Sequence, residues 1–98
     1  MAFQVKFEDE AVDHLDALTA RERTAILAGI EKQLIHQPHV STRHRKQLRP
    51  NPLAKWQLSI GNFRAFYDVD EIQNKVVILA IGLKVGNRLV IGGKEYKT

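Results

Sequence analysis

A chain of 98 residues with 44% hydrophobic and 27% charged side chains has the composition of one ordinary globular domain. It contains no cysteine, which excludes a disulfide framework, a thiolate zinc site, an iron–sulfur cluster and a cysteine nucleophile. The longest apolar run, residues 76–83, is far shorter than the roughly 18 residues that a membrane-spanning helix needs. We therefore expect a single domain over residues 1–98 that is cytoplasmic and has no membrane partner.

The net charge of +4 is distributed unevenly along the chain. Residues 1–31 hold seven acids and three bases, whereas residues 32–67 hold seven bases and no acid. Residues 68–98 hold four acids and five bases. A cationic block of this length is typical of a protein that binds a polyanion, most often a nucleic acid. The plainer interpretation is a solvated basic face that balances an acidic one.

The N-terminal third predicts a strand followed by two helices. Apolar residues alternate over Phe3–Phe7, which indicates a short strand. Apolar residues spaced three and four apart then predict a helix over residues 11–18. The sequence TARE at residues 19–22 is a capping-box pattern, so a second helix should begin there and end before Pro38. Two helices joined this tightly form an αα-hairpin.

The C-terminal half changes to the period of two that is typical of strands. It follows a basic, proline-containing loop over residues 37–52. Gly61-Asn62 is suited to a type II′ hairpin turn, and Gly92-Gly93 should break the chain ahead of a mobile tail. We predict strands over residues 56–60, 63–69 and 75–85, and a short further strand over residues 88–91.

Together these elements predict an α+β fold in the order β-α-α-β-β-β, with a twisted antiparallel sheet packed on an N-terminal αα-hairpin. In the strand over residues 63–69, alternation places Arg64 on the face opposite to Phe63 and Ala65. A mid-sheet arginine has two possible environments. It either pairs with a carboxylate, of which Asp68 is the candidate on its own strand, or lies on the face that the helices leave uncovered.

The next strand predicts the surroundings of this arginine. On that strand, one face is expected to carry Ile78, Ala80, Gly82 and Lys84. Small residues at these positions would leave a shallow floor. A fixed arginine on such a floor, beside a cationic loop, is suited to bind a phosphate group.

The residues predict neither a metal site nor a cofactor. The histidines at positions 36, 39 and 44 include a pair spaced by three, but a proline separates that pair and no carboxylate lies nearby. No glycine-rich loop precedes a helix, so binding of ATP or NAD has no support. Neither serine lies in a nucleophile-elbow pattern.

Two stretches carry a resemblance to a known family: LRPNP over residues 48–52 and WQLSIGNFRAFYDVD over residues 56–70. With the order of the elements, they resemble the RelE/ParE superfamily of type II toxin–antitoxin toxins. The most specific part lies at residues 58–69 and is followed by the apolar strand at residues 76–83. The resemblance implies a toxin that forms a hetero-oligomer with a cognate antitoxin. It also implies a metal-independent endonuclease that cuts mRNA on the ribosome and inhibits translation.

The resemblance also implies roles for individual residues. Arg64 matches the family's strand arginine and would bind the scissile phosphate. Lys46 lies in the region where RelE-type toxins carry basic catalytic or RNA-binding side chains, and Lys84 lies where the family often has a second basic residue. The implied catalytic residues are Arg64, Lys84, Lys46 and Tyr96. The expected RNA-binding residues are Arg43, Arg45, Arg49, Lys55 and Arg88.

The C-terminal segment departs from the family pattern. Many active members follow the last strand with a His or Arg and then an Arg and a Tyr, so Tyr96 and Arg88 fit those roles only if the tail folds back. The general base stays open among lysine, histidine and tyrosine. A lysine is ordinarily protonated, whereas the imidazole of His44 is of a type suited to proton transfer, unless it is an ordinary surface histidine.

Two other functions remain open from the sequence. A ParE-like protein would poison DNA gyrase by binding it and would need no catalytic side chains. A toxin fold that has lost its activity would survive as an antitoxin-binding module.

Overall fold

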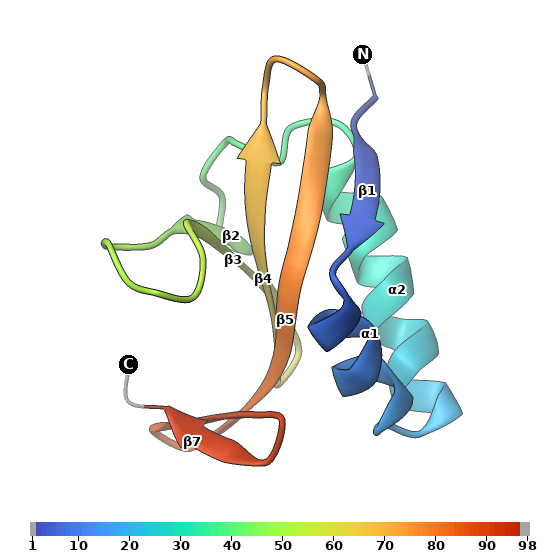
Figure 1. Ribbon diagram of the computed structural model, residues 1–98, viewed down its shortest axis with the longest axis vertical. Helices are drawn as coiled ribbons and strands as arrows, with labels where there is room; N and C mark the ends of the chain where they lie inside the picture. The colour runs from blue at the N-terminus through green and yellow to red at the C-terminus, as the bar shows by residue number, and fades with distance from the viewer. Residues whose placement is uncertain (1, 97–98) are drawn as a thin grey trace.

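Two helices cover one face of a twisted sheet in the computed structural model, which describes residues 2–96 (Figure 1). In chain order the elements are β1 (Gln4–Phe7), α1 (Asp9–Asp16), α2 (Ala20–Leu34), β2 (Arg45–Gln47), β3 (Trp56–Ile60), β4 (Phe63–Asp70), β5 (Lys75–Val85), β6 (Arg88–Ile91) and β7 (Lys94–Tyr96). The predicted α+β architecture is confirmed. Among the described residues, no helix is long and apolar enough to span a membrane.

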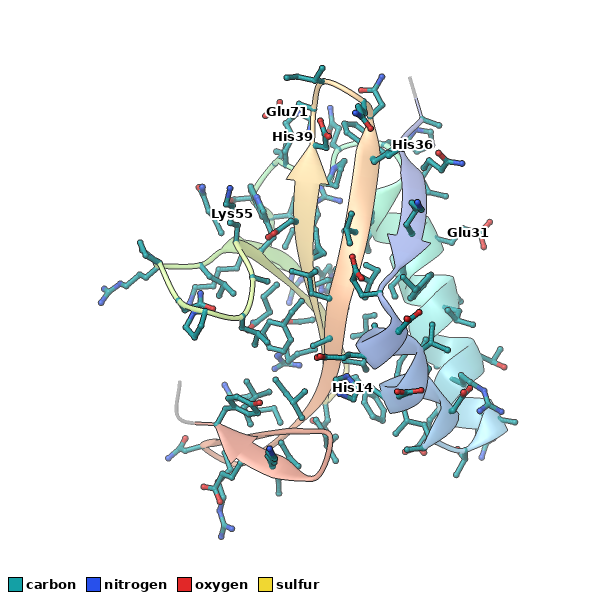
Figure 2. The ribbon with its side chains drawn as sticks, in the orientation of Figure 1. His14, Glu31, His36, His39, Lys55 and Glu71 are labelled. Atoms are coloured by element: carbon teal, nitrogen blue, oxygen red, sulfur yellow. The ribbon has the colours of Figure 1, made fainter. Side chains whose placement is uncertain are left out.

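The long strand β5 organises the sheet, whose order is β2-β3-β4-β5-β6-β7. On one edge β5 pairs with β4, and on the other edge it pairs first with β1 and then with β6. Between these two partners, the backbone N–H of Ile81 donates to Nδ1 of His14 at 3.2 Å, so a side chain of α1 fills the gap (Figure 2). The pairing of β1 with β5 is parallel, which corrects the all-antiparallel sheet that the sequence predicted.

The αα-hairpin forms as predicted. The Thr19 hydroxyl accepts from the N–H of Glu22 at 3.2 Å, and the Glu22 carboxylate accepts from the N–H of Thr19 at 3.0 Å. This capping box satisfies two of the free N–H groups at the start of α2. From there α2 buries a stripe of Ile26, Ile30 and Leu34 against the sheet.

The main core lies between the helices and the sheet, and Tyr67 is at its centre. This residue is fully buried, stacks on Trp56 with ring centroids 6.1 Å apart, and donates its hydroxyl hydrogen to the carbonyl of Pro38 at 2.7 Å. Burial raises the pKa of Tyr67 well above its usual value, and the nearby Arg45 charge lowers it by a smaller amount. The hydroxyl therefore stays neutral and ties the segment after α2 to the sheet.

We expect Tyr67→Phe to lower the free energy of unfolding by about 1 kcal/mol at neutral pH, because the buried carbonyl of Pro38 loses its donor. Tyr67 ionises at a higher pH in the folded state than in the unfolded state. Its contribution is therefore complete below about pH 10 and is lost as the pH rises above it. Urea unfolding from pH 7 to 11 should show a steeper loss of stability for the wild type than for the variant. Equal slopes would contradict this role.

The structure contains one turn that the sequence predicted and two short strands, β2 and β7, that it did not predict. The β3–β4 turn forms as predicted, with Gly61 at φ +57°. The predicted loop over residues 37–52 contains β2, which pairs with β3. The predicted mobile tail is instead β7, because Gly92 and Gly93, at φ +58° and +78°, turn the chain into a hairpin with β6. The last two residues of that predicted tail lie outside the described residues.

A register shift in β5 changes which residues share a face. Phe66 pairs with Ala80 but Tyr67 pairs with Ile78, so Leu79 is an extra residue in β5. Ile78 consequently packs in the main core, whereas Ala80 packs in a second cluster on the opposite side of the sheet. The prediction that these two residues share a face is therefore wrong.

The second cluster covers the part of the sheet that the sequence predicted to be a shallow floor of small residues. It is formed by Ala54, Phe66, Ala80, Leu89 and Ile91, with Leu48, Leu53 and Leu79 packed against it. A Cβ on Gly82 would lie 2.9 Å from Ile91 and 3.0 Å from Leu89, so β6 closes directly over this glycine. The small residues of β5 therefore make room for β6 rather than for a ligand.

Candidate nucleic-acid interface

The sheet face opposite the helices carries polar and basic side chains at one end. We call this surface the open face and define it by His44, Lys46, Gln57, Ser59 and Arg64. The loop between β2 and β3 projects on this side, away from α1 and α2 (Figure 1). The β6–β7 hairpin closes the other end of the sheet, and its turn at Gly92 lies close to His14 of α1. Part of the cationic block of the sequence, including Lys46 and Arg64, thus lies on the side of the sheet that the helices leave uncovered.

The strand register arranges these side chains in two rows. Ser59 lies opposite Arg64, and its N–H donates to the carbonyl of His44 at 2.9 Å, in continuation of the β2–β3 register. Lys46 lies opposite Gln57 in the neighbouring row. Directly opposed residues share a face of a sheet. The first row therefore consists of His44, which directly precedes β2, Ser59 in β3 and Arg64 in β4. Adjacent strands are about 4.8 Å apart.

Arg64 is held by the backbone and has no acidic partner. Its Nη1 donates to the carbonyls of Gly61 and Phe63, both at 2.8 Å. Its Nε and Nη2 make no hydrogen bond or ion pair with any described residue, and Asp68 instead accepts from the N–H of Lys55 at 2.8 Å. The Nε–Nη2 edge of the guanidinium is thus oriented and free. This edge can hold a phosphate through two parallel hydrogen bonds.

Four further basic residues of the block are exposed. Lys46 lies in β2, and Lys55 lies just before β3 on the side of the sheet away from the helices (Figure 2). Arg43 precedes β2, and Arg49 follows it. Within residues 2–96, none of the four forms an ion pair, so their charge is available to an external anion.

The loop that carries Arg49 is ordered by one asparagine. The Asn51 side chain donates to the carbonyls of Arg49 at 2.7 Å and Ala54 at 3.0 Å. Its oxygen accepts from the N–H groups of Leu53 at 2.8 Å and Ala54 at 3.2 Å. This network fixes the border of the open face without a regular element.

Arg45 does not belong to the open face. It lies opposite Leu58 on the helix side of the sheet and is only 9% exposed. Its Nη1 donates to the carbonyl of Gln33 at 2.6 Å, and its Nε donates to the carbonyl of Val40 at 2.9 Å. The prediction that Arg45 binds RNA does not fit this burial, because its guanidinium caps the end of α2 and the loop that follows.

The predicted site residues near the C-terminus, Lys84, Arg88 and Tyr96, lie on two faces of the sheet. Lys84 and Tyr96 oppose the same residue of β6, which places both on the side of Arg64. Tyr96 nevertheless lies three strands from β4, about 15 Å along the sheet. Arg88 lies on the other face, where its Nη1 is 4.0 Å from a carboxylate oxygen of Glu95. The tail folds back, but it does not bring either residue beside Arg64.

Two hollows of the described residues are lined by none of the five residues that define the open face. One, of about 380 Å³, is lined by the acids Glu8, Asp9 and Glu10 together with three apolar or proline residues. Another, of about 520 Å³, lies between α1 and the end of the sheet, with Leu18 and Phe63 in its wall. Residues 2–96 contain no cluster of three or more His, Asp or Glu side chains that could hold a metal ion. The residues of the open face are spread over neighbouring strands, an arrangement that suits an extended polymer better than a small molecule.

The fold of this chain is similar to that of a solved structure. The crystal structure of the toxin–antitoxin complex RelBE2 from Mycobacterium tuberculosis contains a chain that matches this one with a TM-score of 0.74 and 25% identity. The match covers 86% of this chain and 100% of that chain. The chain has a RelE-like fold. No protein-family model and no curated protein matches its sequence.

Gln57 and Ser59 belong to the open face of this RelE-like fold but were not predicted as site residues from the sequence. A signal for them was present. A two-residue turn at Gly61-Asn62 fixes the register of the hairpin, which places Ser59 directly opposite Arg64. The third member of that row, His44, could not be placed in this way because β2 was not predicted.

Proposed function

We propose that the chain is the toxin of a type II toxin–antitoxin system and that it cuts mRNA on the ribosome without a metal ion. The similarity to the RelBE2 complex supports the toxin assignment. The observation that carries the nuclease proposal is Arg64, whose guanidinium is fixed by two carbonyls and has a free edge on a basic surface. A phosphodiester of single-stranded RNA is the ligand that this edge fits best.

The proposed reaction is an attack by the 2′-hydroxyl on the adjacent phosphorus. The O2′–P bond forms, the P–O5′ bond breaks, and the products are a 2′,3′-cyclic phosphate and a 5′-hydroxyl. Arg64 binds the phosphate and stabilises the charge that develops on its oxygens. Lys46, in the neighbouring row, and Lys55 and Arg49, at the border, attract the RNA backbone.

An antitoxin partner fits the same surface. A basic surface attracts an acidic segment that folds when it binds and covers the cations. Such a segment would block RNA and toxin activity together. We therefore propose a hetero-oligomer of this chain with an acidic antitoxin.

A gyrase poison is the second candidate, and the position of Tyr96 favours it. Tyr96 lies three strands from β4, so it does not complete a compact catalytic group with Arg64. A protein that acts by binding gyrase needs no such group.

The test is induction of the chain in growing bacteria, followed by mapping of RNA ends. We expect growth to stop, new ends to form within translated messages, and the product of an adjacent open reading frame to restore growth. DNA breaks with intact messages would replace the nuclease proposal with the gyrase proposal. Unimpaired growth would contradict both and leave an antitoxin-binding module.

A further inference from the structure

We propose that His44 is the general base of this reaction, an inference that rests on the proposed function. The backbone of His44 is fixed at the entry to β2. Its N–H donates to the Thr42 hydroxyl at 3.2 Å, and its carbonyl accepts from the N–H of Ser59 at 2.9 Å. The imidazole is exposed and makes no hydrogen bond or ion pair with any described residue. Both ring nitrogens are therefore available to a ligand.

The spacing between His44 and Arg64 is suited to one nucleotide linkage, with its phosphate and ribose. His44 and Arg64 lie on either side of Ser59, two strand spacings apart, so their Cα atoms are about 10 Å apart. Ser59, between them, has the shortest side chain of the row. A phosphodiester that lies across this row would have its phosphate at the guanidinium and its ribose on the side of the imidazole.

The other groups on this side are less suited to accept a proton. The ammonium groups of Lys46 and Lys84 are of a type that is charged at neutral pH. Tyr96 is three strands from β4, and Asp68 lies four residues along β4 from Arg64, about 13 Å away. An imidazole is the side chain whose neutral form accepts a proton near pH 7.

The proposed step balances as follows. A ring nitrogen of neutral His44 takes the proton of the 2′-hydroxyl while O2′ forms its bond to phosphorus. The electron pair of the breaking P–O5′ bond stays on O5′, which takes a proton from water. The imidazolium that results then returns its proton to solvent.

The experiment compares purified wild-type chain with His44→Ala and with the control His36→Ala on translating ribosomes. His36 is also an exposed histidine, but it follows α2 on the helix side of the molecule (Figure 2). We expect His44→Ala to cut about 100-fold more slowly and His36→Ala to match the wild type. The pH–rate profile of the wild type should fall on the acidic side, as the base becomes protonated and can no longer accept a proton. His44→Ala should lose this acidic limb, and added imidazole should restore part of its rate.

Each outcome decides the inference. If the wild type cuts and His44→Ala cuts equally fast with the same pH profile, His44 is not the base and the nuclease proposal stands. A slow variant that retains the acidic limb and does not respond to imidazole would also overturn the inference. If the wild type itself does not cut, the proposed function fails, and the role of His44 fails with it.

Discussion

Arg64→Gln is expected to lower the rate of message cleavage by about 100- to 1000-fold, the loss typical of removing one donor that stabilises a developing oxyanion. Glutamine keeps a polar side chain of moderate length but loses the charge and the two-pronged edge. Toxicity on induction should fall in parallel. The measurement is the single-turnover rate on translating ribosomes, together with the growth of induced cells.

The control for Arg64→Gln is Arg21→Gln, which removes an exposed arginine from the first turn of α2 on the other side of the sheet. This control should cut at the wild-type rate. Arg64 contributes to the fold only through its two bonds to carbonyls of the β3–β4 hairpin, so its variant should lose no more than about 1 kcal/mol of stability. Equal toxicity of Arg64→Gln and wild type would remove the nuclease proposal and leave the RelE-like fold.

The local chemistry of the sequence was sufficient to predict the helices and the first hairpin. The capping box at Thr19 and Glu22 marks a helix start that no other pattern in the chain resembles. Gly61 in first place of a two-residue turn sets the β3–β4 register. Because β4 has no bulge, strand alternation then placed Arg64 on the correct face. These features depend on residues that are close together along the chain.

The features that could not be predicted depend on distant partners. Residues 45–47 are entirely polar, so they look like a loop, and they form a strand only because β3 offers a free edge. The bulge at Leu79 lies inside an unbroken apolar run, where no period marks an extra residue. The parallel pairing of β1 with β5 is likewise a property of the assembled sheet.

The burial of Arg45 could not be predicted for the same reason. In the sequence it stands among Arg43, His44 and Lys46 and cannot be told apart from them. Once residues 45–47 form a strand, neighbouring side chains must point to opposite faces. Arg45 is thereby directed toward the helices, and Lys46 toward the open face. One residue of the cationic block thus stabilises the fold, and its neighbour is left free for a ligand.

Arg45→Ala is expected to lower the free energy of unfolding by about 3 kcal/mol. The variant removes the donors to the partly buried carbonyls of Gln33 and Val40 and leaves a space beside the end of α2. A hydrogen bond from a charged donor contributes about 1.5 to 3 kcal/mol, and the variant loses two such bonds. Urea unfolding followed by circular dichroism measures the loss.

Arg43→Ala is the matched control, because Arg43 is an exposed arginine two residues away. Its stability should stay within about 0.5 kcal/mol of the wild type, since surface substitutions rarely exceed that value. If both residues bound RNA from the surface, the two variants would be equally stable and equally weak in RNA binding. The burial of Arg45 predicts the opposite pattern: Arg45→Ala loses stability, whereas Arg43→Ala keeps its stability and binds RNA more weakly. A stable Arg45→Ala variant with impaired RNA binding would contradict the structural role of Arg45 and restore it to the interface.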